Sequence, residues 1–538
     1  MVKQQFLATA FKLFSRRERW VFSILFFLGL FGLVGLASIF NAKALIEVPA
    51  SGGSLSEGLI GSPRFINPLL ATSDTDKDLS YLVYSGLMRI TPNNELIPDL
   101  AENYEISSSG LEYTFTLKNN LVWQDGKPIT ADDVVFTIEQ VKNQTIKSPR
   151  FPNWEGITAK KIDAKTVKFT LRQAYGGFLE NTTLGLLPQH LWQAVEPEAF
   201  PFSPLNVEPI GSGPYQIAAT HKNNQKIAEA YELIPFAQFA LGRAKITNLI
   251  IKFYPNEEAR LEAYRKGEIE VLAALDPNTA KTLTQEPGIT LKRTTLPRIF
   301  AVFFNQNHAK VLADQATRRA LDQAINKSKL VDIVLGGFGL AVDNPLGLAA
   351  SSTTNLKTLA KPIEFSLATA DTPELKQAAE FLQKTWSEIG ASVTLDIFEA
   401  GDLNQNVIRP REYDALLFGE VIGRRAELYP FWHSSQRLDP GLNIALYTNS
   451  SVDKLLESAR EENDPEKHLS DQTKANQTIK TDQPASFLYR PDFLYLLPQN
   501  VHGVNLPTLN SNAERFANIY EWYRNTDQVW PIFKNLVR

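Results

Sequence analysis

The sequence predicts a mixed α/β protein of more than one domain, carried behind one apolar N-terminal helix. Three observations support this fold class. The chain has 538 residues, more than a single hydrophobic core normally holds. Stretches that alternate apolar and polar residues are interspersed with stretches of helical spacing, which indicates strands and helices in mixed order. Near the N-terminus, 21 consecutive residues, 20–40, carry no charge.

The uncharged stretch at residues 20–40 (WVFSILFFLGLFGLVGLASIF) is long enough to span a bilayer as a helix. Five basic residues precede it and only Lys43 follows closely, so the positive-inside bias places the N-terminus in the cytoplasm and the large domain outside. We therefore expect a basic, amphipathic cytoplasmic segment at 1–19, a single-pass transmembrane anchor at 20–40 and a flexible linker at 41–56. The alternative is a cleaved signal peptide, although cleavable apolar cores run to only about 7–15 residues.

The composition excludes several classes of protein. Hydrophobic residues make up 43% and charged residues 21%, an ordinary globular balance. Beyond residue 50 there are 49 basic and 57 acidic residues, a net charge of -8, so nucleic acid is not an expected partner. The chain has no cysteine, which excludes disulfides, thiolate nucleophiles, cysteine-ligated metals and a lipid-modified N-terminal cysteine.

Two strands and a helix are predicted in the first third of the chain. Residues 111–117 (LEYTFTL) and 166–171 (TVKFTL) alternate apolar and polar side chains, as half-buried strands do. Between them, residues 130–141 (TADDVVFTIEQV) have helical spacing. Thr130 and Asp133 resemble a capping box, which indicates that this helix begins just after Thr130.

Two further helices are predicted downstream. Residues 256–266 (NEEARLEAYRK) form an amphipathic pattern that Gly267 ends, and the apolar run 269–275 follows. Residues 373–389 (PELKQAAEFLQKTWSEI) give the strongest helical pattern, with Thr372 as its N-cap. The range 363–398 thus reads as a βαβ unit with an expected right-handed crossover.

A search for catalytic or metal-binding motifs finds none. No two of the six histidines lie within five residues of each other, which excludes H-E-x-x-H. The S-x-x-K at 451–454 lacks its usual companion motifs, and the glycines at 336–339 lack the third glycine of a dinucleotide fingerprint. We therefore expect no catalytic residues, no metal and no cofactor, and a binding protein rather than an enzyme.

Seven stretches, collinear over residues 57–505, resemble motifs of one family, the family 5 solute-binding proteins of ABC transporters, which bind peptides, dipeptides and nickel. The stretches are 66–68 (INP), 84–88 (YSGLM) with 98–102 (PDLAE), 113–117 (YTFTL) with 123–127 (WQDGK) and 130–134 (TADDV), 209–215 (PIGSGPY), 267–271 (GEIEV), 318–326 (RRALDQAIN) and 443–453 (NIALYTNSSVD). Any one of them is a modest match, but their order and spacing make chance implausible.

The resemblance implies a two-lobe periplasmic-binding-protein-like fold with an extra subdomain. In that fold each lobe has a β-sheet flanked by helices, hinge strands join the lobes, and the ligand lies between them. The implied division is lobe I at 51–85, 207–300 and 505–538, the extra subdomain at 86–206 and lobe II at 301–504.

The resemblance also implies a function. Such a bacterial receptor binds a peptide, here expected to be an oligopeptide, by contacts to the amide groups that all peptides share. The lobes close on the ligand, and ABC permease subunits in the membrane recognise the closed form. We expect a monomer with its large domain extracytoplasmic, at the cell surface or in the periplasm. The helix at 20–40 would take the place of a lipid anchor.

The segment at 418–436 (FGEVIGRRAELYPFWHSSQ) is the main candidate for ligand contact. In peptide-binding members this region carries a Gly-Trp pair, then an Asp that pairs with the ligand's α-amino group, then an acidic residue followed by Pro. Glu427 falls where that acidic residue belongs, and the amine-binding Asp falls near Arg424 or Arg425. The sequence thus departs from the family pattern at the amine-binding position.

Two interpretations of this departure remain open, because an arginine cannot pair with an ammonium group. Either Glu420 or Glu427 pairs with the ligand amine from a shifted position, or the ligand is not held by a free N-terminus. Arg424 and Arg425 would suit a carboxylate, and the alternative is a solvated pair of loop residues. We expect Glu420→Ala to lower peptide affinity more than Glu427→Ala.

The remaining candidates for ligand contact are chosen by their position at the ends of predicted strands or within the segment 418–436. Glu420 ends the apolar strand 415–418, where clefts of α/β folds form. Trp432 and His433 either contact ligand or pack within the lobe. Near the inferred cleft edge, residues 65–67 follow the first strand of lobe I, and residues 305–306 end a strand at the inferred hinge. The predicted ligand-binding residues are Phe65, Ile66, Asn67, Asn305, Gln306, Glu420, Arg424, Arg425, Glu427, Trp432 and His433.

Three other functions are compatible with the sequence. The same fold could bind a non-peptide solute such as an oligosaccharide or a nickel chelate, as the loss of the amine-binding Asp would permit. It could also be a peptide sensor or chaperone without transport. An anchored hydrolase is the alternative from another class, and turnover of a labelled peptide would reveal it.

Overall fold

The computed structural model describes residues 15–174, 176–350, 357–462 and 464–533. The chain divides into a small unit, made of residues up to Gly52 and from Tyr523 onward, and a body, Gly53–Trp522.

The small unit contains α2 (Arg16–Ala44), which carries the predicted apolar stretch. Residues Arg16–Leu36 have a mean hydropathy of 2.0, and none of the apolar side chains in this window is buried by the protein. A helix that is apolar all round and unburied has the length and composition to cross a membrane, and a signal sequence has the same properties. Most of the expected cytoplasmic segment, residues 1–14, lies outside the described residues.

The same unit holds a two-stranded antiparallel sheet of β1 (Ile46–Ala50) and β20 (Asn525–Val529). This differs from the expected flexible linker at 41–56, because residues 46–50 pair their backbone groups with those of β20. Residues 54–60 then form the first strand of the body. The expected tail of lobe I, 505–538, is also divided, since its residues from Tyr523 onward belong to the small unit.

The body is built on a sheet of twelve strands. Ten strands follow one another across it in the order β17-β16-β18-β14-β19-β12-β2-β11-β10-β9, and β13 and β15 also pair with β19. Their bounds are β2 (Ser54–Ile60), β9 (Tyr215–Lys222), β10 (Ala228–Pro235), β11 (Asn248–Tyr254), β12 (Val271–Ala273), β13 (Ile289–Thr295), β14 (Arg298–Phe304), β15 (Gly339–Ala341), β16 (Ile363–Ala370), β17 (Ala391–Phe398), β18 (Ala415–Val421) and β19 (Ala485–Pro498).

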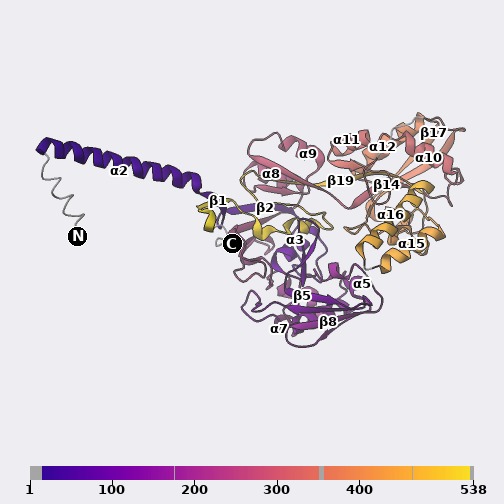
Figure 1. Cartoon of the computed structure of the whole chain (residues 1–538). Coiled ribbons are helices and arrows are strands. Elements are labelled where there is room, and N and C mark those ends of the chain that lie inside the picture. Colours follow the sequence, from indigo (N-terminus) through magenta and orange to yellow (C-terminus); the bar gives the residue numbers. More distant parts are fainter. Residues whose placement is uncertain (1–14, 175, 351–356, 463, 534–538) are drawn as a thin grey trace. The chain divides into compact units, whose positions relative to one another are not determined.

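The long strand β19 divides this sheet into two halves (Figure 1). Its C-terminal part pairs with β12 and β13 in the first sheet half, and its N-terminal part pairs with β14 in the second sheet half. Within the described residues of the body, the chain crosses between the halves at two places, Leu296 after β13 and Arg490 within β19. Arg490 Nε donates to the Leu296 carbonyl at 3.0 Å, and the Leu296 N–H donates to the Pro491 carbonyl at 2.9 Å, so the two crossings are bonded to each other.

A separate four-stranded antiparallel sheet, here called the small sheet, forms the third part of the body (Figure 1). Its strands, in the order β5-β6-β8-β7, are β5 (Ala101–Ile106), β6 (Glu112–Leu117), β7 (Ile157–Lys161) and β8 (Thr166–Leu171). The strands β3 (Met88–Ile90) and β4 (Leu96–Pro98) pair nearby. The predicted strands at 111–117 and 166–171 are therefore confirmed.

Helices flank both sheet halves and the small sheet. Their bounds are α3 (Asp74–Val83), α4 (Ala131–Lys142), α5 (Phe151–Trp154), α6 (Phe178–Asn181), α7 (Gln189–Trp192), α8 (Glu257–Arg265), α9 (Pro277–Leu283), α10 (Gln315–Ala324), α11 (Lys327–Leu335), α12 (Pro373–Ser387), α13 (Ala400–Asp402), α14 (Tyr429–Trp432), α15 (Ser450–Glu461) and α16 (Pro465–Asp482). Shorter helical turns are η1 (Pro197–Phe202), η2 (Pro204–Asn206), η3 (Lys310–Leu312), η4 (Leu403–Ile408), η5 (Ser434–Gln436), η6 (Asn512–Phe516), η7 (Ile519–Glu521) and η8 (Pro531–Phe533).

The helix signals in the sequence are confirmed. The N-cap of α4 is Thr130, and both hydrogen bonds of the predicted capping box with Asp133 are present. Asn256 caps α8, and Thr372 caps α12, which buries Leu375, Leu382 and Trp386 along one stripe. β16 and β17 on either side of α12 pair in parallel, as the predicted βαβ unit requires.

A buried charge cluster holds the C-terminal part of the body to the first sheet half. The Arg515 guanidinium, fully buried, donates to Glu57 of β2 at 2.7 and 3.0 Å and to Asp78 of α3 at 2.7 and 2.8 Å. The Tyr495 hydroxyl donates to the second Glu57 oxygen at 2.9 Å. η6 is thereby tied to β2, α3 and β19.

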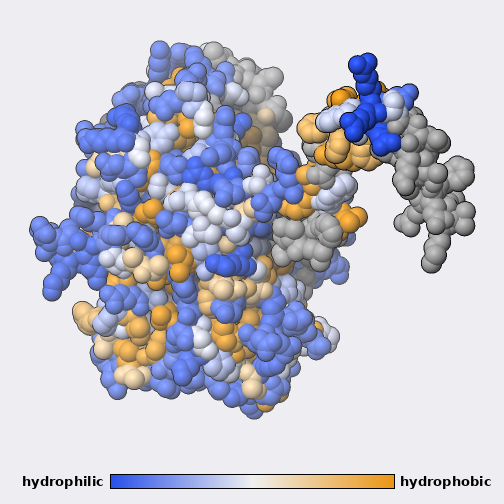
Figure 2. Space-filling view, turned by 90° about the vertical axis from the view of Figure 1, so that its left-hand side faces the viewer, coloured by the Kyte–Doolittle hydropathy of each residue, from blue (hydrophilic) through white to orange (hydrophobic). Residues whose placement is uncertain are grey.

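On the face of the body shown in Figure 2, hydrophilic residues predominate, and hydrophobic areas lie among them, most visibly in the lower half of the view.

Candidate ligand-binding site

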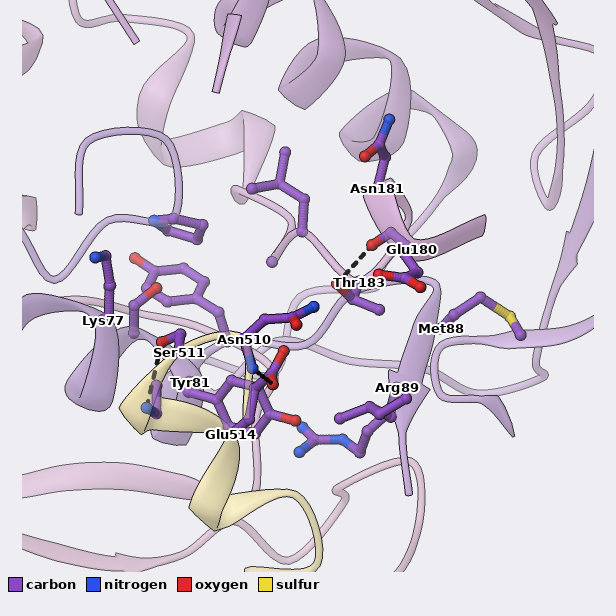
Figure 3. Close-up of a pocket in the computed structure, with 18 of the residues that line it drawn as sticks. Lys77, Tyr81, Met88, Arg89, Glu180, Asn181, Thr183, Asn510, Ser511 and Glu514 are labelled. Atoms are coloured by element: carbon purple, nitrogen blue, oxygen red, sulfur yellow. Dashed lines mark hydrogen bonds between the residues drawn. The ribbon is translucent and has the colours of Figure 1, made fainter. Parts of the chain in front are cut away.

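A cavity of about 300 Å³ lies in the body and is lined by residues from all three of its parts. The first sheet half contributes α3 and the segment 510–514, the small-sheet part contributes residues 150–154 and 180–185, and the second sheet half contributes Arg424. Figure 3 shows Tyr81, Arg89 and Glu514 along one side, with Glu180 and Asn181 across from them. Ligand pockets in proteins range from about 300 to 1,000 Å³, so this cavity suits a compact ligand.

Helix α3 supplies one wall because its polar side chains recur at helical spacing. Lys77, Tyr81 and Tyr84, at intervals of four and three, face the cavity, whereas Leu79 and Leu82 are fully buried in the core. The Ser73 side chain caps the helix by accepting the Asp76 N–H at 3.1 Å. The wall is thus set by an ordinary amphipathic helix with a defined start.

Arg424 joins the second sheet half to the other parts of the body. Its Nη2 contacts Glu514 Oε2 at 2.6 Å and donates to the Thr508 carbonyl at 3.1 Å, and its Nε donates to Asn94 at 3.3 Å. Glu180, from the small-sheet part, lies 3.7 Å from Nη1. The Arg424 side chain is 10% exposed, so these contacts are shielded from water and strengthened accordingly.

The wall also holds a second buried ion pair. Arg89 Nε contacts Asp99 Oδ2 at 2.8 Å, and the Arg89 guanidinium lies over the Tyr81 and Phe239 rings at 5.1 and 5.3 Å. Burial raises the pKa of Glu514, and the nearby Arg424 opposes that rise. The cavity is therefore a charged site whose groups interact strongly.

Of the residues predicted from the sequence to bind ligand, Arg424 lines the cavity and the other ten do not. Ile66 and Asn67 are fully buried, and the Asn67 side chain accepts the Leu69 N–H and donates to Asn206 Oδ1 at 3.1 Å. The Phe65 N–H donates to Asp76. These groups shape the turn after β2, so a ligand contact for them stays a prediction.

Asn305 and Gln306 lie at the far end of β14 from the chain crossings. Asn305 is buried, and its side chain donates to the Arg411 carbonyl at 2.9 Å. The expected position of these residues at the hinge is wrong, because the chain crosses at Leu296, before β14 begins. Their predicted ligand contact remains untested.

Glu420 and Trp432 are core residues of the second sheet half. Glu420 in β18 is 7% exposed and lies opposite Ile299, and burial raises its pKa well above the ordinary range. Burial thus disfavours the charged carboxylate that an ion pair with a ligand ammonium would require. Trp432 is 1% exposed and packs on Phe303 and Phe487. Ligand binding by Glu420 or Trp432 stays a prediction, and the burial of both side chains argues against it.

Arg425 and Glu427 make contacts within the protein. Arg425 Nη1 donates to the Gly176 carbonyl of the small-sheet part at 2.8 Å, so it too contacts another part of the body. Glu427 Oε1 accepts from Gln472 at 3.2 Å and from the Tyr429 N–H at 3.3 Å. Neither contact excludes a second role, and their ligand contacts remain predictions.

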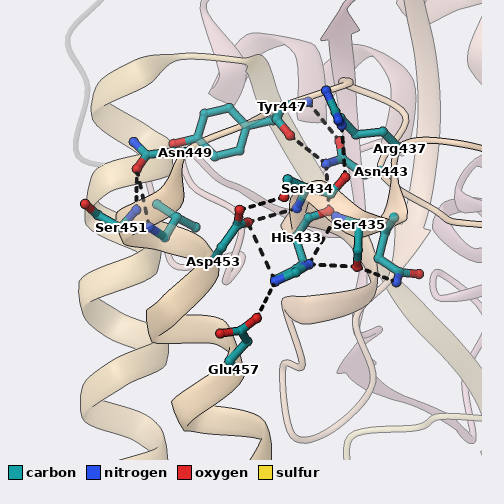
Figure 4. Close-up of polar contacts among 12 residues, drawn as sticks. His433, Ser434, Ser435, Arg437, Asn443, Tyr447, Asn449, Ser451, Asp453 and Glu457 are labelled. Atoms are coloured by element: carbon teal, nitrogen blue, oxygen red, sulfur yellow. Dashed lines mark hydrogen bonds and ion pairs between the residues drawn. The ribbon is translucent and has the colours of Figure 1, made fainter.

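His433 belongs to a polar cluster that fastens α14 to α15 (Figure 4). Its Nδ1 is 2.8 Å from the Ser435 hydroxyl and its Nε2 is 3.3 Å from Glu457. The ring stacks on Tyr429, with centroids 4.3 Å apart, and Asp453 binds Ser434 next to it. The His433 ring is thus used in packing, and its proposed ligand contact is untested.

Several cavity residues were not predicted from the sequence. Asp99 falls within the PDLAE stretch, which could have drawn attention to it. Tyr84, in the YSGLM stretch, is a weak cleft candidate from the sequence, since it could equally be a buried structural residue. Lys77, Arg150 and Glu514 carry no local signal, because single charged residues on a helix or turn are common on any surface.

Comparisons with known proteins agree with the fold and the sequence motifs. Residues 95–357 match the family model described as "Bacterial extracellular solute-binding proteins, family 5 Middle". The oligopeptide-binding protein AppA of Bacillus subtilis is 27% identical over 504 residues, covering 86% of this chain and 91% of AppA.

Solved structures extend this similarity. A structure of Bacillus subtilis AppA in complex with a nonapeptide has a TM-score of 0.66 and 25% identity, covering 88% of this chain and 99% of that one. NikZ from Campylobacter jejuni in complex with Ni(L-His) has a TM-score of 0.68 and 25% identity, covering 87% and 99%. The resemblance inferred from seven sequence stretches is confirmed, as is the α/β fold of periplasmic-binding-protein type.

Proposed function

Because the chain belongs to family 5 of the bacterial extracellular solute-binding proteins, the non-catalytic substrate-binding proteins of ABC transporters, we propose that it binds peptides and delivers them to an importer. The solute class of the family, peptides or nickel complexes, follows from the relatives, and the choice of peptide is our proposal. AppA, the relative described above, is an oligopeptide-binding protein.

The observation that carries this proposal is a polar cavity to which all three parts of the body contribute. Arg424 reaches from the second sheet half to Glu514, Thr508 and Asn94 of the other parts. In the described part of the body, two chain crossings join the sheet halves. With so few covalent constraints, the halves can separate to admit a ligand and then close over it. A ligand that contacts both halves favours the closed arrangement, and a permease can then distinguish occupied from empty receptor.

The two chain crossings between the sheet halves also lead us to propose a division of the body into lobes. Lobe I comprises 51–85, 207–300 and 505–538, the extra subdomain comprises 86–206, and lobe II comprises 301–504. The chain crossing at Leu296 supports the boundary close to 300. The crossing at Arg490 favours a second boundary near 490 instead of 504, because residues 492–498 of β19 pair with β13 of the first sheet half. The residues from Tyr523 onward are better assigned to the small unit, as β20 pairs with β1.

We further propose that α2 is an uncleaved anchor. Its uncharged stretch of 21 residues, longer than the roughly 7–15 residues of a cleavable apolar core, supports this assignment over a cleaved signal. An anchor holds the receptor near its permease and so raises the effective concentration of the complex. Mass spectrometry of the protein from membranes should find a peptide from residues 1–15, and a mature N-terminus after residue 40 would contradict the anchor.

Binding of peptides can be measured with the full-length protein in lipid nanodiscs. Isothermal titration calorimetry with a mixed library of two- to nine-residue peptides should show saturable binding, and permease-containing vesicles should then accumulate the bound peptides. No heat and no uptake with any length class would contradict the proposal.

A second candidate is a compact non-peptide solute such as a nickel chelate. The small cavity volume favours it, and NikZ, one of the similar structures, was solved with Ni(L-His). Native mass spectrometry of the purified protein separates the two candidates, because a retained ligand reveals its own mass.

A further inference from the structure

We propose that residues 530–532 of the small unit (Trp530, Pro531 and Ile532, here called the 530–532 segment) insert into the outer headgroup region of the bilayer that α2 spans as an anchor. This inference rests on the proposed anchor and goes beyond it by naming a second contact with the membrane. The partner is lipid, and the contact attaches the C-terminal strand of the protein to the same bilayer as α2.

The pairing of β1 with β20 directs the 530–532 segment back towards α2. β1 begins at Ile46, two residues after α2 ends at Ala44, and Ile46 lies opposite Val529, the last residue of β20. Because the two strands are antiparallel, β20 runs towards the end of α2. Trp530 therefore leaves the sheet at the end next to α2.

The dimensions of a bilayer place this end of the sheet beside the headgroups. At about 1.5 Å per residue, the 21 uncharged residues of α2 cover roughly 31 Å, close to the ~30 Å thickness of the hydrocarbon core. Each headgroup region adds roughly 5–7 Å, and the helical residues 41–44 cover about 6 Å. β1 thus begins near the outer border of the headgroups, and the 530–532 segment, directed back towards α2, extends into them.

The exposed side chains of the small unit change in character at the same end. Residues 525–528 of β20 (NTDQ) are polar and exposed. Trp530 and Ile532 follow, with 45% and 78% of their surface exposed. Among the small-unit side chains that the structure describes outside α2, these two are the large hydrophobic ones that are exposed. The apolar surface of this sheet is therefore confined to the end nearest the membrane and continues the apolar surface of α2.

The residue types suit the headgroup region. A tryptophan ring has an apolar body and a polar N–H, and tryptophan is enriched at membrane–water interfaces for this reason. The exposed Ile532 side chain gains free energy when it leaves water for the boundary of the acyl chains. Pro531 has no N–H, so the turn between them has one polar group fewer to desolvate.

Lipid is a better partner for this segment than a second copy of the chain. A stable protein interface buries about 800 Å² on each partner, far more than two side chains provide. Two side chains suffice for lipid, because α2 already holds the segment at the bilayer and raises its effective concentration there. Since β1 and β20 lead into the two chain connections to the body, insertion would fix the height of both connections above the bilayer.

The test measures the depth of single fluorescent labels on the full-length protein in phosphatidylcholine vesicles. The chain has no cysteine, so Ile532→Cys, Thr526→Cys and Leu30→Cys each carry one site for an environment-sensitive thiol label. Vesicles would contain lipids with a nitroxide quencher either at the headgroup or deep in the acyl chain. Thr526 is the matched control, because it is exposed on the same strand and lies about 10 Å further from α2 than Val529. Leu30 lies within α2 and reports the anchor, and thermal unfolding identifies any variant that fails to fold.

Headgroup quenching of the label at position 532 should be roughly threefold stronger than at position 526. Adding Trp530→Ser to Ile532→Cys should lower it towards the value at 526. Equally weak quenching at 532 and 526 would overturn the membrane contact, and deep quenching at position 30 in the same experiment would leave the anchor standing. Quenching at 532 without quenching at 30 would overturn the anchor and support the contact.

Two other results would also count against the proposal. No quenching at 532 or 30 would overturn both the contact and the anchor. A blue-shifted emission at 532 that lipid quenchers do not reduce would mean that protein, such as a second copy of the chain, covers the segment, and it would overturn the assignment to lipid. Peptide binding is measured separately by calorimetry, so none of these results bears on the proposed ligand.

Discussion

Replacing Arg515 by methionine should destabilise the body strongly, because this side chain is the only cation in a buried cluster with two acids. The change removes four hydrogen bonds to carboxylate oxygens and leaves Glu57 and Asp78 facing each other out of water. Breaking a buried ion pair by removing one partner costs about 3–5 kcal/mol of the free energy of unfolding. We expect a loss within that range at pH 7.

The loss should depend on pH in a defined direction. Burial already raises the pKa of Asp78 to about 6 in the native protein, with Arg515 acting against the rise. In the variant the opposing effect of Arg515 is gone, so the folded state holds a proton on Asp78 at a pH where the unfolded state has released it. A raised carboxyl pKa gives stability that is present at low pH and is lost as pH rises. The destabilisation should therefore be smaller at pH 4.5 than at pH 7.

Urea unfolding of the full-length protein, followed by tryptophan fluorescence, measures both quantities. Arg265→Met is a suitable control, because Arg265 ends α8 at the surface and should change stability by less than about 0.5 kcal/mol. Ligand affinity should fall as well, since the neighbouring Glu514 lines the cavity. A loss below about 1 kcal/mol at pH 7, or an equal loss at both pH values, would refute the assigned role of the cluster.

Three further predictions concern the segment 418–436. Arg424→Ala should weaken ligand binding roughly 5- to 50-fold by removing the contact to Glu514, and a calorimetric affinity equal to the native one would exclude a role in closure. Burial raises the pKa of the native Glu420 carboxyl, so stability should fall as pH rises above about 4.5, by up to about 1.4 kcal/mol per pH unit, and Glu420→Gln should abolish this fall. Free energies of unfolding that depend on pH in the same way in both proteins would contradict this. Trp432→Phe should lower the free energy of unfolding by roughly 1–2 kcal/mol with unchanged affinity, and a selective loss of affinity would restore Trp432 as a ligand contact.

Local patterns account for the elements that could be predicted. The capping box at Thr130 and the N-cap at Thr372 act within one helical turn, and the alternation at 166–171 reflects a sheet with one buried face. The sequence could not show that part of the linker expected at 41–56 forms a strand, because β1 pairs with residues more than 470 positions away. Strand pairing at such separation leaves no local trace in the partner segments.

By itself the sequence determined the apolar N-terminal helix, the mixed α/β class and the family, because hydrophobic periodicity, caps and collinear motifs are properties of neighbouring residues. The tertiary structure alone decided which charges form the cavity. Arg150, Arg424 and Glu514 lie in three segments that are far apart along the chain, and each by itself resembles a solvated surface residue. Folding pairs Arg424 with Glu514, buries Glu420 and leaves Arg150 without a partner. A charged side chain either pairs with another group of the protein or stays available to a ligand, depending on which groups the fold brings within hydrogen-bond distance of it. Distances between residues far apart in the sequence cannot be read from the sequence alone.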